Sequence, residues 1–236
     1  MTTLETNLIG IITRTKNVKS FRLAPQHDLT FQAGQFMGIS LNIDGKEQTK
    51  YLSFSSSPTE TSHWEFTKRI TSSEFSQTLD QLKIHDRLNV RMPMGRFILD
   101  EHKKIAFLSG GIGITPIRSM LKNIIDLELP YDVITIYGNR SPHDIVFKED
   151  MDLFCSNDPT KRIIYTIDKP PETPGSWEGE IGLIDAAMIQ NQIPDFSQRK
   201  FYICGPPAMV TNLTNILTND LKISPAYITK ENFTGY

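Results

Sequence analysis

Cysteine is scarce in this sequence, and its scarcity limits the metal chemistry that the chain can perform. Cys155 and Cys204 are the only two among 236 residues. Two thiolates cannot supply the four ligands of an iron–sulfur cluster or a structural zinc, so we expect no such metal site. The chemistry must then rest on an organic cofactor, an intermittently bound metal or side chains alone.

Long apolar runs and an excess of positive charge are also missing. Lys and Arg number 25 against 27 Asp and Glu, and the net charge of -2 gives no basic surplus for binding nucleic acid. No run approaches the roughly 20 apolar residues of a membrane-spanning helix. The apolar stretch between Glu5 and Arg14 is too short for a secretory signal, so we expect a cytoplasmic protein. Nothing in the sequence indicates an oligomeric state.

The length suits two domains of about 100 to 130 residues each. From residue 6 to about 99, turn residues such as Pro25, Gly34 and Pro58 separate six short apolar stretches: LIGIITRT, SFRLA, QFMGISL, YLSFS, WEFTKRI and RLNVRM. This pattern predicts a six-stranded antiparallel barrel. One helix is expected over residues 74–82, after Ser72 and Ser73, which are both good N-cap candidates.

A different pattern begins at Lys103 and predicts an α/β domain. Apolar strands and amphipathic helices alternate in the order KIAFLSG, TPIRSMLKNIIDLEL, YDVITIYG, RIIYTID, KFYICG, PAMVTNLTNILTNDL and AYITKE. This alternation is typical of an open parallel sheet with helices on its faces. We therefore expect a barrel domain at residues 1–101 and a parallel-sheet domain at residues 102–236.

Three glycines lie in LSGGIGITPI, where a predicted strand runs into a predicted helix. Gly110, Gly111 and Gly113 allow a ligand to approach the backbone closely. Thr115 is expected as the helix N-cap, with Pro116 in the first turn. Free N–H groups at such a helix start suit a pyrophosphate. Because Pro116 replaces the last glycine of the GxGxxG pattern, a merely tight turn stays open as the alternative.

The ends of the other predicted parallel strands also carry turn or polar residues. Because the carboxyl ends of parallel strands share one edge of the sheet, we expect four segments to converge there: 110–116, 138–140, Asp168 and 204–209. Cys204 on its own is more typical of a small buried core residue. The four strand ends taken together favour a nucleotide site at this edge.

The motifs GGIGITP, YGNR and CGPPAM, in this order after a half that contains KYLSFSSSP, closely resemble the ferredoxin–NADP reductase superfamily. The resemblance covers nearly the whole chain, from Gly34 to the ENF segment at Glu231. It implies a flavin-binding antiparallel barrel followed by a domain that binds a reduced nicotinamide dinucleotide. FAD is the flavin that the resemblance favours, with FMN as the alternative.

The flavin signature of that family aligns with Lys50, Tyr51, Leu52 and Ser53. By resemblance, Lys50 neutralises a flavin phosphate, as a point charge without the fork of an arginine. Leu52 replaces the aromatic residue that stacks on the flavin ring. Ser53 aligns with a hydroxyl that hydrogen-bonds the flavin N5 atom, where hydride arrives, and is therefore a candidate catalytic residue.

Two further segments align with flavin-binding elements of the family. Residues 73–76 match a Gly-x-x-Ser turn beneath the pyrophosphate, with Ser73 in place of the glycine. Residues 66–68 match a strand whose backbone lines the flavin. The flavin-binding residues implied by these segments are Phe66, Thr67, Lys68, Ser73, Phe75 and Ser76.

In the second domain, the resemblance implies that residues 110–115 face the dinucleotide pyrophosphate. Cys204 would lie near the nicotinamide carbon that releases hydride, Glu231 aligns with a catalytic carboxylate, and Phe233 aligns with an aromatic residue that covers the flavin. The remaining nucleotide-binding residues implied are Pro116, Asn139, Arg140, Gly205, Pro206 and Met209.

Asp168 and Lys169 stand where NADP-using members of the family have a Ser–Arg pair. A carboxylate accepts hydrogen bonds from a free ribose hydroxyl and repels a 2′-phosphate, so the sequence favours NADH. NADPH stays open, because Lys169 or Arg140 could pair with the phosphate.

The resemblance thus implies a flavin-dependent reductase that takes hydride from NADH onto FAD. It would pass electrons singly to a separate carrier such as a ferredoxin, a flavodoxin or an oxygenase component, or to a small molecule. Two alternatives stay open. The chain could reduce free flavin or ferric complexes, or it could serve as a non-autonomous flavin-carrying subunit of a larger complex.

Overall fold

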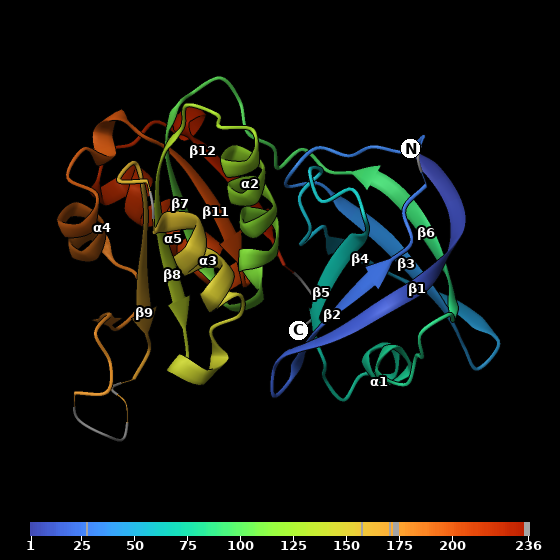
Figure 1. Cartoon of the computed structure of the whole chain (residues 1–236). Coiled ribbons are helices and arrows are strands. Elements are labelled where there is room, and N and C mark those ends of the chain that lie inside the picture. Colours follow the sequence, from blue (N-terminus) through green and yellow to red (C-terminus); the bar gives the residue numbers. More distant parts are fainter. Residues whose placement is uncertain (27, 157, 170, 172–174, 234–236) are drawn as a thin grey trace. The chain divides into compact units, whose positions relative to one another are not determined.

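The computed structural model describes residues 1–236 except 27, 157, 170, 172–174 and 234–236. Residue contacts divide the chain into two compact units, each of which can be followed in Figure 1. Among the described residues, the first consists of Met1–Leu99 and Thr115–Leu127, and the second of Asp100–Ile114 and residues 128–233. The domain boundary expected between residues 101 and 102 stays a prediction.

An antiparallel sheet of six strands forms the first unit, with the order β4-β3-β6-β1-β2-β5. The strands are β1 (Thr2–Thr15), β2 (Val18–Leu23), β3 (Phe36–Ile43), β4 (Lys46–Ser53), β5 (Trp64–Arg69) and β6 (Arg87–Met94). An isolated bridge between Phe54 and Phe66 joins the chain after β4 to β5, the other edge strand. The predicted six-stranded antiparallel barrel is confirmed.

Strand β1 is longer than the sequence pattern suggested, because it pairs with two neighbouring strands. Its first half, from Thr2 to Asn7, pairs with β6, and its second half, from Leu8 to Thr15, pairs with β2. Helix α1 (Glu74–Asp80) lies within the predicted helix and begins after Ser73, whose hydroxyl accepts the Ser76 amide as expected of an N-cap. Its buried residues Phe75 and Leu79 join the barrel core.

A parallel sheet of six strands forms the second unit, with the order β10-β9-β8-β7-β11-β12. The strands are β7 (Lys104–Gly110), β8 (Asp132–Asn139), β9 (Lys161–Ile167), β10 (Glu180–Ile181), β11 (Lys200–Gly205) and β12 (Ile228–Asn232). All five pairings between neighbours are parallel. The open parallel sheet predicted from the alternating pattern is confirmed.

Helices cover both faces of this sheet (Figure 1). Helices α4 (Ala186–Gln192) and α5 (Pro207–Asn215) share one apolar cluster with alternate residues of β7, β8 and β11, while α3 (Lys148–Cys155) lies on the opposite face. There the Tyr165 hydroxyl of β9 donates to Asp152 of α3 at 2.7 Å. A π-helical turn (Ile216–Asp220) extends α5. Single 3₁₀ turns lie at Gly111–Gly113, Pro142–Asp144, Phe196–Gln198 and Pro225–Tyr227.

The start of helix α2 (Ile114–Asp126) corrects one expectation. Thr115 was expected as its N-cap, but the 3₁₀ turn Gly111–Gly113 runs directly into the helix, so helical backbone is already established before Thr115. Thr115 is therefore a buried residue of the first helical turn, next to Pro116.

Candidate cofactor sites

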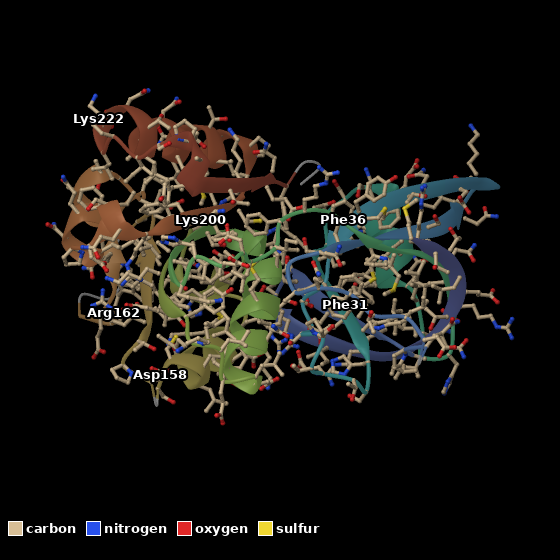
Figure 2. All side chains as sticks on the ribbon, turned by 90° about the horizontal axis from the view of Figure 1, so that it is seen from above. Phe31, Phe36, Asp158, Arg162, Lys200 and Lys222 are labelled. Carbon is tan, nitrogen blue, oxygen red and sulfur yellow. The ribbon has the colours of Figure 1, made fainter. Side chains whose placement is uncertain are left out.

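The end of β4 presents the predicted flavin signature. Ser53 is 5% exposed, and its hydroxyl makes no hydrogen bond with any residue that the structure describes. Leu52 is half-buried and packs against the barrel core, whereas Lys50 and Tyr51 are exposed. The Tyr51 ring lies edge-on to Phe36 of β3, at a centroid distance of 5.8 Å; Figure 2 labels Phe36. Ser53 thus offers a hydroxyl that a ligand can engage.

Lys68 is a buried lysine without an acidic partner. It is 5% exposed, and its ammonium donates to the Arg69 carbonyl at 3.1 Å. Within the described part of the chain, no carboxylate pairs with Lys68 or Lys50. Burial, and then the positive charge of Lys50, lowers the pKa of Lys68 below its usual value. Two neighbouring ammonium groups without an anion fit the phosphates of a flavin dinucleotide.

The 73–76 turn is closed by its own hydroxyl groups. The Ser73 hydroxyl accepts from the Ser76 amide at 3.3 Å, and the Thr71 hydroxyl lies 3.1 Å from both serine hydroxyls. Glu74 is exposed, and its carboxylate accepts from the Gln48 side chain at 3.3 Å. A phosphate at this turn would have to replace these internal bonds, so its binding here stays a prediction.

Three of the predicted flavin-binding side chains belong to the barrel interior. Phe66 is fully buried and stacks on Phe21 at 5.2 Å, and Phe75 is 1% exposed within the same core. The Thr67 hydroxyl lies 2.7 Å from the Ser20 hydroxyl and 2.8 Å from that of Ser55. These side chains support the strand and helix that carry them, which leaves only their backbone available for a ligand.

A buried charge cluster beside this segment was not predicted from the sequence. Glu65 is 1% exposed, and its carboxylate lies 3.2 Å from Arg14 and 3.0 Å from Arg22. The Ser55 hydroxyl donates to the same carboxylate at 2.9 Å. The partners are 51, 43 and 10 residues apart in sequence, so no local pattern could have brought them together.

At the carboxyl edge of the parallel sheet, the two predicted nucleotide turns touch each other. A Cβ on Gly113 would lie 2.3 Å from the Cys204 carbonyl oxygen, and one on Gly110 would lie 2.3 Å from the Met209 sulfur. Gly111 differs, because its φ is +54° and a Cβ there would meet nothing within 4 Å. Glycine at 110 and 113 therefore allows the turns to pack, while Gly111 faces open space. Pro206, the residue directly before α5, is exposed.

Buried polar atoms without partners lie at the same edge. Asn139, at the end of β8, is 5% exposed, and neither atom of its side-chain amide has a hydrogen-bond partner among the described residues. The Ser109 hydroxyl at the end of β7 is likewise buried and unpaired. Buried polar groups are normally hydrogen-bonded, so these orphaned atoms fit a polar ligand such as a dinucleotide. Sequence reasoning identified Asn139 but missed Ser109.

The residues predicted to select the nicotinamide cofactor lie at the ends of β8 and β9. The Asp168 amide donates to the Asn139 carbonyl at 2.9 Å, which joins the two strand ends. Asp168, Lys169 and Arg140 are all exposed. Their charges are therefore open to a ligand or to solvent.

Cys204 and Glu231 are direct neighbours in the parallel register of β11 and β12. Cys204 is fully buried, and burial together with the nearby Glu231 raises the pKa of its thiol well above the usual value. Burial raises the pKa of Glu231 to about 7, and no residue that the structure describes hydrogen-bonds its Oε2 atom. Phe233 is half-buried, and its amide donates to the Gly205 carbonyl at 2.9 Å. A thiol and a titratable carboxyl thus meet at this edge.

Two family models match the chain in the order of its two halves. An oxidoreductase FAD-binding domain matches residues 6–98, and an oxidoreductase NAD-binding domain matches residues 107–214. Together they identify the two halves of the chain as the FAD-binding and NAD-binding domains of an oxidoreductase. The chain belongs to the ferredoxin–NADP reductase superfamily, as its motifs predicted.

Similar proteins match most of the chain's length. NADH-cytochrome b5 reductase 1 of Eremothecium gossypii is 32% identical over 224 residues, which cover 90% of this chain and 77% of the relative. The glycine betaine monooxygenase reductase subunit of Chromohalobacter salexigens is 28% identical over 218 residues. Those residues cover 90% of this chain but 59% of that subunit, so the chain spans little more than half of its length.

Among solved structures, the cytochrome b5 reductase domain of Ulva prolifera nitrate reductase matches with a TM-score of 0.85 at 21% identity. The match covers 98% of this chain and 97% of that domain, and it supports the fold. In the part of the chain that the structure describes, no helix is long and apolar enough to cross a membrane. The same residues contain no group of three or more His, Cys, Asp or Glu side chains suited to a metal ion.

Proposed function

We propose that this chain takes hydride from NADH onto bound FAD and passes the electrons singly to a separate protein carrier. The observation that supports this most strongly is the close packing of the glycine turn at Gly113 on the Cys204 backbone, because it joins the two predicted nucleotide turns beside the strand that carries Glu231. When bound, FAD supplies the conversion between two-electron and one-electron transfer. The proposal places the reaction in the cytoplasm, where NADH is available.

On the barrel unit, the chain's own residues would bind and orient the flavin. Lys50 and Lys68 would hold its phosphates, since both ammonium groups lack an acidic partner among the described residues. Ser53 would donate its free hydroxyl to the reacting edge of the ring. Leu52 would give the ring an apolar contact from the same strand.

On the parallel-sheet unit, residues at the carboxyl edge would bind the dinucleotide. The open space at Gly111 suits the pyrophosphate, and the unpaired amide of Asn139 offers both a donor and an acceptor. Glu231, whose pKa is about 7, would hold a proton at its carboxyl group near neutral pH. Cys204 would remain a neutral thiol, because its pKa is raised.

NADH is the favoured donor in this proposal. Asp168 is exposed at the end of β9. Its carboxylate would repel a 2′-phosphate and would accept a hydrogen bond from a free ribose hydroxyl. The name of the Eremothecium gossypii relative supports the same choice. Lys169 and Arg140 are the groups that would favour NADPH instead.

The electron acceptor is proposed to be a ferredoxin, a flavodoxin or an oxygenase component. The Chromohalobacter salexigens relative is named as the reductase subunit of a monooxygenase, which supports a carrier of this kind. Steady-state reduction of ferricyanide and of a purified ferredoxin by NADH, with FAD identified by mass spectrometry of the released chromophore, tests the proposal. Turnover with ferricyanide and the ferredoxin is expected, at one FAD per chain.

Two outcomes would replace this proposal with another. Loss of the flavin on gel filtration, with turnover restored by added free flavin, would indicate a reductase that uses flavin as a diffusing substrate. Tight FAD binding with slow reduction by both NADH and NADPH would indicate a subunit that relays electrons only inside a complex.

A further inference from the structure

Ser55, Ser56 and Ser57 form a buried run, here called the serine segment, that begins two residues after Ser53. All three residues are 0% exposed. Every backbone and side-chain polar group of the segment has a hydrogen-bond partner within the first unit, whereas the Ser53 hydroxyl has none among the described residues. The segment therefore fixes the chain directly after the free hydroxyl.

Strand β5 holds one side of the serine segment through Glu65. The amides of Ser55 and Ser56 donate to the Glu65 carbonyl at 2.7 and 3.3 Å. The Ser55 hydroxyl donates to the Glu65 carboxylate at 2.9 Å, and the Ser56 hydroxyl accepts from the Glu65 amide at 2.9 Å. The carbonyl groups of both serines are left for another element.

Helix α2 holds the other side. Arg118 donates from Nη1 to the Ser55 carbonyl at 2.7 Å, and the Ser119 hydroxyl donates to the Ser56 carbonyl at 2.6 Å. Both bonds span 63 residues of sequence. The same helix follows directly after the glycine turn Gly111–Gly113. Arg118 and Ser119 thus complete the hydrogen bonding of the segment that follows Ser53.

Glu60 fixes the direction of the arginine. Arg118 Nη1 lies 2.8 Å from Glu60 Oε2, and the same oxygen accepts from the Ser57 amide at 2.7 Å. Burial alone would raise the pKa of Glu60, but the hydrogen bond and charge of Arg118, together with the Ser57 amide and the charge of His63, hold that pKa below its ordinary value. Because the Arg118 side chain is 6% exposed and the carboxylate stays charged, the pair is locked in one geometry.

We propose that Arg118 is a positioning residue for flavin reduction, which holds the Ser53 hydroxyl in place through the Ser55 carbonyl and the serine segment. The inference rests on the proposed function, because Ser53 matters only if a flavin is reduced beside it. Arg118 itself has no part in the chemistry. Its effect must therefore disappear when the Ser53 hydroxyl is removed.

The test uses Arg118→Lys in the FAD-loaded protein. Lysine keeps the charge, but its side chain is shorter than the one that places Nη1 between Ser55 and Glu60, and it lacks the Nη2 bond to Glu60, so it cannot hold both partners in the same geometry. Arg199→Lys is the matched control, since Arg199 is 4% exposed and binds Asp195, Asp132 and the Ile105 carbonyl, all in the second unit. If Arg118→Lys does not fold, Ser119→Ala replaces it as a milder change to the same segment.

Three measurements are made on Arg118→Lys, Ser53→Ala and the double variant. The limiting rate of flavin reduction by NADH should fall about 10- to 100-fold in Arg118→Lys, with NADH affinity little changed, and less than about threefold further on the Ser53→Ala background. The flavin midpoint potential should shift in the same direction in both single variants without adding in the double variant. Hydrogen exchange over residues 50–57 should rise in Arg118→Lys but not in Arg199→Lys.

Two results would overturn the inference. The first is that Arg118→Lys matches Arg199→Lys in hydrogen exchange, in flavin midpoint potential and in the rate of flavin reduction. The other is a rate loss of equal size with and without the Ser53 hydroxyl, because Arg118 would then act elsewhere. Failure of the proposed function would be seen in the wild type, as bound FAD that neither NADH nor NADPH reduces. In that case the flavin midpoint potential and the hydrogen exchange of the variants would still decide the role of Arg118.

Discussion

The serine segment of the barrel and the carboxyl edge of the parallel sheet differ in how completely their buried polar groups are hydrogen-bonded. Every polar group of Ser55, Ser56 and Ser57 is hydrogen-bonded within the protein. At the sheet edge, the side-chain amide of Asn139 and the hydroxyl of Ser109 are buried and have no partner within the described part of the chain. A satisfied segment is rigid before any ligand arrives, whereas unpaired buried groups gain most when a ligand supplies the missing bonds. We infer that the flavin side is preorganised and that the nucleotide side is completed by its ligand.

Gly113→Ala should have the largest effect on this comparison. The added Cβ would lie 2.3 Å from the Cys204 carbonyl oxygen, so the two turns could not pack, and we expect a loss of about 3 kcal/mol or more in unfolding free energy. Gly111→Ala is the matched control, because its Cβ meets nothing and only the positive φ costs about 1–2 kcal/mol. Urea unfolding measures both variants, and equal losses would show that turn packing is unimportant.

Ser53→Ala should slow flavin reduction by NADH roughly 10- to 1,000-fold while changing FAD affinity much less. The reason is that Ser53 carries a free hydroxyl on a rigid support. Stopped-flow absorbance at saturating NADH gives the rate, and fluorescence titration of the apoprotein gives the affinity. An unchanged reduction rate would remove Ser53 from the mechanism.

Glu231→Gln should remove a pH dependence of stability. The Glu231 pKa is about 7 in the folded chain against an ordinary 4.5, so between these values the folded state holds a proton that the unfolded state releases. The contribution of Glu231 is therefore complete below about pH 4.5 and is lost as pH rises through 7, a change of about 3 kcal/mol. Urea unfolding from pH 4.5 to 8 should show a steeper decline in wild type than in the variant. Parallel pH profiles would contradict the raised pKa.

Asn139→Leu and Ser55→Ala test the comparison directly, because each changes one buried polar side chain. Ser55→Ala leaves the Glu65 carboxylate with one donor fewer and should cost about 1–3 kcal/mol of stability. Asn139→Leu removes an unpaired amide and should leave the stability of the ligand-free protein within about 1 kcal/mol or raise it. It should nevertheless weaken NADH binding, measured by calorimetry. A strong loss of stability in Asn139→Leu, with NADH binding intact, would mean that the amide has a structural partner.

Asp168→Ser should have the smallest effect, on cofactor choice alone. Removal of an exposed carboxylate from the end of β9 should move the ratio of kcat/KM for NADPH and NADH at least about tenfold toward NADPH. Lys169 would become the available partner of the 2′-phosphate. Steady-state kinetics with both cofactors measures the ratio. If it stays where it is in the wild type, Asp168 does not contact the ribose.

Local sequence patterns were sufficient for most of the fold and for the packing of the glycine turn on the Cys204 turn. Strands β7, β8, β9 and β11 follow continuous apolar runs, and the glycines at 110 and 113 mark the turn that the structure packs against Cys204. Helices α3 and α4 escaped prediction because each spans only about two turns, although Asp185 caps α4 by accepting the Met188 amide. The roles of the individual site residues stay predictions.

The buried polar networks of the barrel could not be predicted from the sequence. Glu65 meets Arg14 across 51 residues, and Arg118 meets Glu60 across 58. In the sequence, each of these partners is an ordinary charged residue, because only the folded chain brings the two into one buried site. Lys68 was predicted from its place in the 66–68 segment, but its burial close to Lys50 appears only in the folded chain.

Anaerobic titration of the FAD-loaded protein, followed by flavin absorbance, tests the central claim most directly. NADH is added to one sample and NADPH to another, and reduction is recorded until it is complete. The account predicts that NADH reduces the bound flavin stoichiometrically and at least about tenfold faster than NADPH at equal low concentrations. Bound flavin that neither cofactor reduces, or that NADPH reduces faster, would contradict it.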